Sequence, residues 1–364
     1  MKRIVLTGGG TAGHVMPNLA LIPELQKLGW EIHYIGSREG IEKELLAGAG
    51  LPYHPIATGK LRRYLSLKNL SDPFRVLGGL YQSFRLLKKI RPRIVFAKGG
   101  FVSVPVVIAA WLNRIPVILH ESDLTPGLAN RICTPFADLV CVSFPETMEH
   151  LPAGKTVLTG NPIRRFLLSG SKEEGLALCG FSPGRPVLLV IGGSLGAARI
   201  NSLIRAILPQ LTKDFQVIHI CGRGRLDPGL VKTRGYRQFE FAGPELPHIL
   251  AAADLCVSRA GANFLFELLA LKKPALLIPL PKTASRGDQI LNARSFAAQG
   301  FSMVLPEEEA TEETLLERIH QLYRNRQELV GKMENYAVKD ALAEVVKLIT
   351  AKADSRSRVT RGPR

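Results

Sequence analysis

The feature that most constrains the fold is a pattern of strand, glycine-rich turn and helix that occurs twice. It spans VLTGGGTAGH at residues 5–14 and VIGGSLGAAR at residues 190–199. In both segments a run of apolar residues ends in glycines that let the backbone turn sharply into a helix. Short, almost wholly apolar runs alternate with segments of helical length along the rest of the chain. Strands that are apolar on both faces indicate parallel sheets covered by helices, so we predict two Rossmann-like, doubly wound α/β halves.

The apolar runs predict six strands in each half. In the first half they occupy residues 3–8, 31–36, 94–99, 117–122, 139–144 and 155–160. In the second half they occupy residues 186–193, 215–222, 238–243, 255–261, 275–280 and 302–305. Helical segments lie between most of them, for example at 16–29 and 199–211, and a further helical stretch is predicted at 311–351.

A chain of 364 residues is long enough for two domains. We predict an N-terminal domain at residues 1–162 and a C-terminal domain at 163–340, with a polar linker near 162–184. Residues 341–364 are expected to form a helix that packs back on the first domain, with a frayed basic tail from residue 351. Because ligands of parallel α/β sheets bind beyond the carboxyl ends of the strands, we expect the site where the two halves face a cleft.

The composition excludes several classes of protein. With 46% hydrophobic and 22% charged residues, the chain is an ordinary globular one. Its five cysteines are widely spaced and form no Cys-x-x-Cys pair, which argues against a disulfide framework or a zinc site. No apolar run approaches the ~18 residues of a membrane-spanning helix, and the N-terminus has too few apolar residues for a signal peptide. We therefore expect a protein that is soluble or lies on a membrane surface.

The formal net charge of +17 predicts an anionic partner. Residues 60–98 contain eleven Lys or Arg and one acid, and their apolar residues would form one stripe on a helix. This pattern is typical of a core-facing helix with a solvated basic side, or of a peripheral contact with an anionic membrane. Nucleic acid is a weaker alternative, because no binding motif is recognisable. The candidates for membrane contact are Arg62, Arg63, Phe74, Leu77, Phe84, Lys88 and Lys89.

Residues 8–13 match the GxGxxG spacing of a phosphate-binding turn. Exposed amides and the helix dipole favour an anion there, although such turns also serve simply to pack a strand against a helix. A dinucleotide site would need an acid about 20 residues later, where this chain has Arg38. Arg38 would suit an NADP phosphate, so an NADP-dependent oxidoreductase is one alternative. The presence of His14 directly after the turn argues against it.

Polar residues follow several other predicted strands, at the edge of each sheet where a ligand would bind. They occupy residues 98–101, 120–123, 160–164, 192–194, 258–263 and 288–292. Glu267 lies one turn past the start of the helix that Gly261 opens, where a carboxylate could accept both hydroxyls of a ribose. An acid at this place in a helix also complements the helix dipole, which is the simpler interpretation.

Seven motifs occur in an order that resembles a known family. They are GGGTAGH (8–14), KGGFVSVP (98–105), HESDLTPGLANR (120–131), GNPIR (160–164), GGSLGA (192–197), SRAGANFLFE (258–267) and DQILNA (288–293). The set is similar to that of the MurG family, the bacterial UDP-N-acetylglucosamine transferases that convert lipid I to lipid II. The resemblance implies a GT-B fold, in which two Rossmann-like domains face a cleft and the second holds most of the nucleotide sugar.

The resemblance also implies roles for individual residues. Thr11, Ala12 and Gly13 would line the region of the sugar nucleotide and the acceptor diphosphate. Donor contacts would come from Asp123, Arg164, Ser194, Gly243, Ala262, Asn263, Phe264, Leu265, Phe266, Glu267 and Gln289. Glu267 would bind the ribose hydroxyls and Gln289 the hydroxyls of the GlcNAc ring. Many members have Gln-Asn at 122–123 and other side chains at 263–266, so at 263–266 only backbone contacts are implied.

The implied reaction is a single inverting displacement, in which an acceptor hydroxyl attacks the anomeric carbon as UDP leaves. It needs a general base and stabilisation of the leaving diphosphate. We assign His14 as the base or as the group that orients the acceptor, and Glu121 as the second catalytic candidate. Helix N-termini and Arg164 would stabilise the diphosphate. Because the chain has no convincing Asp-x-Asp pair, we expect no metal and no tightly bound cofactor.

The expected partners follow from the same resemblance. They are UDP-GlcNAc as donor, a polyprenyl-diphosphate lipid as acceptor and an anionic membrane surface, with no nucleic acid. The expected location is the cytoplasmic face of the bacterial cell membrane. A GT-B glycosyltransferase that acts on another lipid, such as a diacylglycerol, is the nearest alternative.

Overall fold

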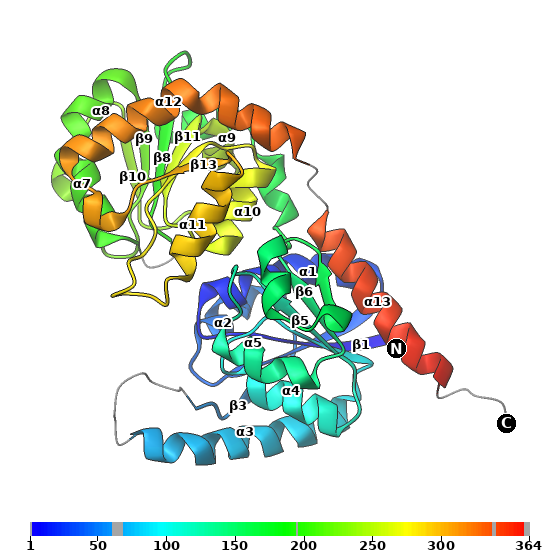
Figure 1. Cartoon of the computed structure of the whole chain (residues 1–364). Helices are drawn as coiled ribbons and strands as arrows, with labels where there is room; N and C mark the ends of the chain where they lie inside the picture. The colour runs from blue at the N-terminus through cyan, green and yellow to red at the C-terminus, as the bar shows by residue number, and fades with distance from the viewer. Residues whose placement is uncertain (1, 60–67, 194–195, 337–339, 360–364) are drawn as a thin grey trace. The chain divides into compact units, whose positions relative to one another are not determined.

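The computed structural model describes residues 2–59, 68–193, 196–336 and 340–359. The chain divides into two compact units: unit 1 contains residues 1–163 and 339–364, and unit 2 contains residues 164–338. Each unit is an α/β domain built on one parallel sheet (Figure 1).

Unit 1 has a seven-stranded parallel sheet in the order β3-β2-β1-β4-β5-β6-β7. Its strands are β1 (Lys2–Thr7), β2 (Trp30–Ser37), β3 (Tyr53–Ile56), β4 (Ile94–Ala97), β5 (Val117–Glu121), β6 (Leu139–Val142) and β7 (Thr156–Leu158). Its α-helices are α1 (Met16–Lys27), α2 (Ile41–Leu45), α3 (Lys68–Ile90), α4 (Ser103–Leu112), α5 (Leu128–Cys133) and α13 (Ala341–Val359). The strand order reverses between β1 and β4, which is where ligands of such sheets bind.

The core of unit 1 lies on both faces of this sheet. Side chains of β1 alternate between the faces, as in any strand, and all of them from Ile4 to Thr7 are buried. Ile4 and Leu6 belong to a cluster with apolar residues of α1 and α13, whereas Val5 belongs to a cluster with α3 and α4. An ion pair of 2.9 Å between Lys352 and Asp138 also ties α13 to this unit.

Unit 2 has a six-stranded parallel sheet in the order β10-β9-β8-β11-β12-β13. Its strands are β8 (Val187–Ile191), β9 (Gln216–Ile220), β10 (Tyr236–Phe239), β11 (Leu255–Ser258), β12 (Ala275–Leu277) and β13 (Ser302–Val304). Its α-helices are α6 (Lys172–Cys179), α7 (Ala198–Ala206), α8 (Leu208–Asp214), α9 (Leu246–Ala252), α10 (Ala262–Ala270), α11 (Asp288–Ala298) and α12 (Glu312–Asn335). The order reverses between β8 and β11, so the loops after these strands lie at the equivalent place.

The structure corrects the sequence prediction at five places. The edge strand β3 is missing from the prediction, and β10 begins at Tyr236 rather than at residue 238. The single helix expected at 199–211 is two helices that meet at Ile207, and the stretch at 311–351 is likewise divided into α12 and α13. The tail expected to fray from residue 351 remains helical to Val359.

None of the described helices combines the length and the apolar character needed to span a membrane.

Candidate active site

A buried carboxylate holds the glycine-rich loop that follows β1. Glu42 of α2 is fully buried, and its Oε2 accepts a hydrogen bond of 3.1 Å from the Gly10 amide. Its Oε1 accepts from the amide and the hydroxyl of Ser37, at 2.9 and 2.5 Å. A Cβ on Gly9 would lie 2.5 Å from this carboxylate. A side chain at position 9 would displace the Glu42 carboxylate from its hydrogen bonds, so glycine is favoured there.

His14 ends the 3-10 turn (Ala12–His14) that leads from this loop into α1. Its Nδ1 lies 3.0 Å from the Gly9 carbonyl oxygen and 3.1 Å from Thr11 Oγ1. A carbonyl can only accept, so we assign the proton of the neutral ring to Nδ1 and the lone pair to Nε2. This tautomer makes Nε2 the basic nitrogen of His14.

A second glycine-rich loop follows β4 and touches the first. Gly99 and Gly100 have φ values of +98° and +80°, which side chains rarely adopt. A Cβ on Gly100 would lie 2.2 Å from the Gly9 carbonyl oxygen. Ser103 Oγ donates to the Gly99 carbonyl at 2.8 Å and fixes the start of α4. The two loops thus form one surface at the carboxyl ends of adjacent strands.

The segment after β5 is held by buried polar side chains. Glu121 is 5% exposed, and its carboxylate accepts from the amides of Asp123 and Gly127 and from Asn130 Nδ2, at 3.0, 2.8 and 2.8 Å. His120 donates from Nε2 to the Gly160 carbonyl at 2.9 Å. Burial lowers the pKa of His120 well below its usual value, which keeps the ring neutral.

Lys98, which follows β4 directly, is 1% exposed. Its ammonium donates to the hydroxyl of Ser122, which in turn donates to Asn161 Oδ1 at 3.4 Å. Burial lowers the pKa of Lys98 to about 8, and the carboxylates of Glu121 and Asp123 oppose that effect. A polar chain thus connects the loops after β4, β5 and β7.

In unit 2 Arg164 forms an ion pair with Glu267 of α10. Arg164 Nε donates to Glu267 Oε1 at 3.0 Å and Nη2 donates to Oε2 at 3.2 Å, in the two-pronged geometry that guanidinium and carboxylate favour. The two side chains are 19% and 6% exposed. Burial raises the pKa of Glu267, whereas the charge and hydrogen bonds of Arg164 lower it.

Side chains also link the loops around the start of α10. Arg259 Nη1 donates to the carbonyls of Ile278 and Pro279 at 3.1 and 3.3 Å, and it forms an ion pair with Glu307. Asn292 of α11 donates to the Ala260 carbonyl at 3.3 Å. Gln289 Oε1 accepts from the Leu280 amide at 3.1 Å. The loops after β11 and β12 are therefore tied to each other and to α11.

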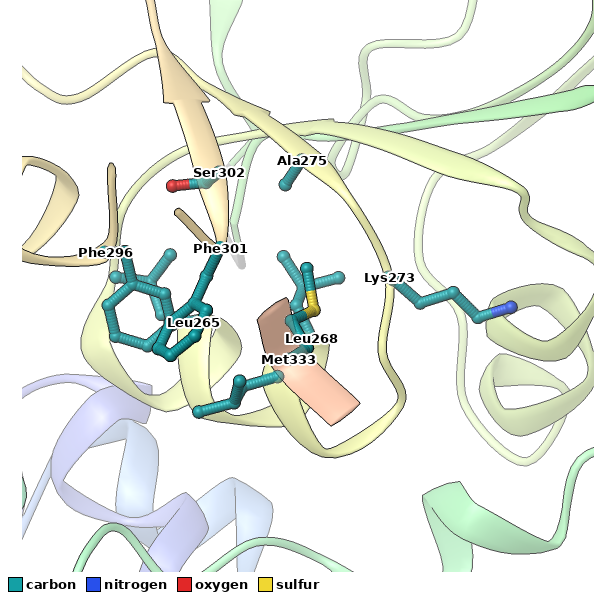
Figure 2. Close-up of a pocket in the computed structure, with 9 residues that line it drawn as sticks. Leu265, Leu268, Lys273, Ala275, Phe296, Phe301, Ser302 and Met333 are labelled. Carbon is teal, nitrogen blue, oxygen red and sulfur yellow. The ribbon is translucent and has the colours of Figure 1, made fainter. Parts of the chain in front are cut away.

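A small cavity of about 10 Å³ lies beneath α10. Figure 2 shows its wall of mostly apolar side chains, among them Leu265, Leu268, Phe296, Phe301 and Met333. Leu265 is 1% exposed and points into this wall. The cavity is therefore a packing feature, and only the backbone of Leu265 is available to a ligand.

The basic helix α3 shows both kinds of surface that its sequence predicts. Leu77 and Tyr81 are 61% and 62% exposed, and Trp111 of the adjacent helix α4 is 54% exposed. Phe84 instead packs partly buried against the core, and the Lys88 ammonium lies 4.6 Å from the centre of its ring. The predicted apolar stripe is therefore divided between core and solvent, with Leu77 and Tyr81 exposed and Phe84 packed against the core.

Comparisons with known proteins agree with this architecture. Residues 4–142 match the glycosyltransferase family 28 N-terminal domain, and residues 187–348 match the corresponding C-terminal domain. A protein of Clostridium botulinum (strain 657 / Type Ba4) is 56% identical over 349 residues, which cover 96% of this chain and 99% of that protein. It is named UDP-N-acetylglucosamine--N-acetylmuramyl-(pentapeptide) pyrophosphoryl-undecaprenol N-acetylglucosamine transferase. This chain belongs to glycosyltransferase family 28.

Further relatives of this family 28 member support the assignment. A protein of the same name from Lachnoclostridium phytofermentans is 57% identical over 96% of this chain and 98% of its own length. The crystal structure of MurG from Acinetobacter baumannii is 27% identical, with a TM-score of 0.77, over 96% of this chain and 100% of that one. The predicted GT-B fold and the glycosyltransferase class are confirmed, and the oxidoreductase alternative is discarded.

The family 28 chain brings most of its predicted site residues into two groups. Thr11, Ala12, Gly13 and His14 lie in the first loop of unit 1, and Glu121 and Asp123 lie after β5 of the same unit. Gly243 precedes α9, and residues Ala262, Asn263, Phe264, Leu265, Phe266 and Glu267 lie on α10. Arg62, Arg63 and Ser194 lie outside the described residues, and Phe74 lies on α3 where side chains are not described.

The sequence-based site lacks one residue that the structure makes prominent in this family 28 enzyme. Glu42 shapes the first loop, yet in the sequence only its place two residues after Gly40 distinguishes it from the other acidic residues. Among the described residues, no group of three or more His, Cys, Asp or Glu side chains is arranged to hold a metal ion.

Proposed function

We propose that this chain transfers N-acetylglucosamine from UDP-N-acetylglucosamine to lipid I, the undecaprenyl-diphosphate-linked muramoyl-pentapeptide, and so makes lipid II for peptidoglycan synthesis. The observation that carries the proposal is the nearly full-length similarity to relatives with that activity in their name, at 56% and 57% identity over 96% of the chain. The aligned region covers 96% of the chain and therefore includes both units.

In this proposal unit 2 binds the donor. Helix α10 begins after Gly261 without a side-chain cap, so the amides of its first turn are suited to the diphosphate of UDP. Glu267 binds the ribose hydroxyls, and Arg164 keeps that carboxyl ionised against the effect of burial. Gln289 binds the GlcNAc hydroxyls, while Gly243 and residues 263–266 contribute backbone contacts.

In unit 1 His14 is the proposed general base. Its Nε2 takes the proton of the acceptor hydroxyl as the oxygen bonds to the anomeric carbon and UDP departs. The imidazolium that forms is stabilised by the Gly9 carbonyl, which accepts from Nδ1. The amides of α10 and Arg164 stabilise the charge that develops on the leaving diphosphate.

Glu121 has a positioning role in this proposal. Its carboxylate already accepts three hydrogen bonds from the segment 123–130. These bonds hold Asp123 and the start of α5 in place. A carboxylate used in this way is a poor acceptor for a substrate proton, so we assign proton transfer to His14.

The acceptor lipid implies a contact with the membrane, and we propose that α3 and α4 make it at the cytoplasmic face. The exposed Leu77, Tyr81 and Trp111 are accompanied by exposed Lys88 and Lys89. Cations attract anionic head groups while nearby apolar side chains enter the interface. Phe84 is left out of this contact because it packs against the core.

The test of the function is an acceptor comparison. The purified chain is incubated with radiolabelled UDP-GlcNAc and either lipid I or diacylglycerol in detergent micelles. We expect label to enter the lipid fraction only with lipid I. Transfer to diacylglycerol alone would instead support a glycolipid synthase of the same fold.

A further inference from the structure

We propose that Lys98 is a positioning residue of the acceptor half-site, where its buried ammonium couples proton binding to the binding of a diphosphate on the two glycine-rich loops of unit 1. The choice of a diphosphate rests on the proposed function, because lipid I carries one. Lys98 does not touch the ligand in this proposal. It acts through the loops that lie against it.

Lys98 lies directly against both loops. Its amide donates to the Thr7 carbonyl at 2.9 Å, at the end of β1. A Cβ on Gly8 would lie 3.1 Å from the Lys98 Cβ, which places the start of the first loop in contact with this residue. The second loop, Gly99 and Gly100, follows Lys98 in the chain and packs on Gly9. The backbone and Cβ of Lys98 therefore contact the start of the first loop, and its chain continues into the second, while its ammonium donates to Ser122.

The titratable groups that face Lys98 include two carboxylates, which only partly compensate the positive charge of its ammonium. They are His120 of β5, Cys141 of β6, and Glu121 and Asp123 at the end of β5 and beyond it. His120 is neutral, and burial raises the pKa of the Cys141 thiol to about 12, so it is neutral too. The balance comes from Glu121 and Asp123, and Glu121 already serves three other donors.

The hydrogen bonding of the ammonium is also incomplete. A lysine ammonium has three N–H donors, and the described structure gives Lys98 one side-chain partner, the hydroxyl of Ser122. Burial lowers the pKa of Lys98 to about 8, and the carboxylates of Glu121 and Asp123 oppose that effect only in part. Packing alone would favour an apolar side chain here, so we assign the buried ammonium a role in binding an anion.

A diphosphate on the loop amides would supply the missing negative charge. By linkage, a ligand that binds the protonated form more tightly raises the pKa of Lys98 by the corresponding amount. Tenfold tighter binding corresponds to a rise of about one pH unit. The acceptor half-site would then weaken between about pH 7 and 9, as the ammonium loses its proton.

The direct test is an NMR titration of the full chain with isotopically labelled lysine. The pKa of Lys98 is measured with and without saturating inorganic pyrophosphate, in the presence of saturating UDP to occupy the donor half-site, and its signal is assigned with Lys98→Met. We expect the pKa to rise by about one pH unit. An unchanged pKa under saturating pyrophosphate overturns the proposal.

Lys273 of unit 2 provides a matched control in the same spectra. Burial lowers its pKa as well, and its ammonium donates to the carbonyls of Ala251 and Ala253 at 3.2 and 2.7 Å. Lys273 belongs to unit 2, whereas both glycine-rich loops belong to unit 1. Its pKa is expected to stay constant when pyrophosphate is added, and an equal rise at Lys98 and Lys273 would show a non-specific effect and overturn the proposal.

Kinetics give the second readout. Lys98→Met is expected to raise KM for lipid I about tenfold, to leave KM for UDP-GlcNAc unchanged and to flatten the pH profile of kcat/KM for lipid I between pH 7 and 9.

The Tm of Lys98→Met is expected to rise, since a buried charge is removed, whereas a merely structural lysine would lower Tm when replaced. Equal KM values for lipid I in Lys98→Met and Lys273→Met contradict the proposal. A wild-type chain that makes no lipid II refutes the proposed function instead, and the NMR titration still decides the role of Lys98.

Discussion

Replacing Arg164 by Met tests the donor half-site most sharply, because it removes one partner of a buried ion pair. The guanidinium makes two hydrogen bonds, of 3.0 and 3.2 Å, to the carboxylate of Glu267. With the side chains 19% and 6% exposed, the pair has little access to water. Met fills a similar volume without the charge, so Glu267 is left buried and uncompensated.

The expected loss of stability follows from that burial. Breaking a buried ion pair by removing one partner costs about 3–5 kcal/mol. Glu267 can take up a proton instead of remaining charged, so we expect about 2–3 kcal/mol at neutral pH. For a domain of this size that lowers Tm by roughly 4–12 °C.

The pH dependence of the Arg164→Met variant has a definite sign. Burial already raises the pKa of Glu267, and loss of Arg164 raises it further. Between the usual glutamate pKa of about 4.3 and this raised value, the folded state binds more protons than the unfolded state. Stability therefore falls as pH rises through that window, and the variant is expected to be more destabilised at pH 8 than at pH 5.

Urea unfolding at pH 5 and pH 8 measures the effect, with Lys272→Met as the control. The Lys272–Glu334 pair is 3.1 Å long but its side chains are 50% and 53% exposed, so its loss should cost under about 1 kcal/mol. Adding Glu267→Gln to Arg164→Met should restore about 1 kcal/mol or more, because the unpaired carboxylate is removed. A loss no larger than that of the control, or no difference between the two pH values, would refute the reasoning.

Three further predictions concern catalysis, backbone strain and the membrane. His14→Ala is expected to lower kcat about 10²–10⁴-fold with KM for UDP-GlcNAc unchanged, and near-normal turnover in a steady-state assay contradicts the role of base. Arg114 has φ of +54° just past the end of α4, so Arg114→Gly should stabilise the chain by about 0.5–1 kcal/mol in urea unfolding; equal or lower stability rules out strain there. Leu77→Ser with Tyr81→Ser, or Lys88→Gln alone, should weaken sedimentation with anionic vesicles and spare UDP binding, and unchanged sedimentation excludes α3 as the contact.

Local sequence pattern predicts most of the fold but not its interruptions. The strand β3 is not predicted because it has only four residues and contains Pro55, which is unusual in a strand. A proline is tolerated there because β3 lies at the edge of the sheet. The break at Ile207 coincides with Pro209, which is tolerated in the first turn of a new helix but would disrupt the interior of a single one. The spacing of apolar residues on α3 likewise does not predict which of them pack against the core. The apolar side of the helix is wider than the part of it that contacts the core.

The candidate site shows the same limit. Glycines and polar strand ends mark both half-sites in the sequence, because the chemistry of anion binding restricts residue type at each position. Contacts between residues far apart in the chain leave no recognisable pattern in the sequence, so they could not be predicted from it. Arg164 and Glu267 are 103 positions apart, and Glu42 reaches Gly10 over 32 positions. The tautomer of His14 and the charge balance of Lys98 also depend on neighbours that only folding provides.

The most direct test of the central claim is the product formed from lipid I and radiolabelled UDP-GlcNAc. The proposed function predicts one labelled N-acetylglucosamine per lipid I, joined with inversion of the anomeric configuration of the donor, and loss of the product in His14→Ala. A folded wild-type chain that binds UDP yet leaves lipid I unlabelled would contradict it.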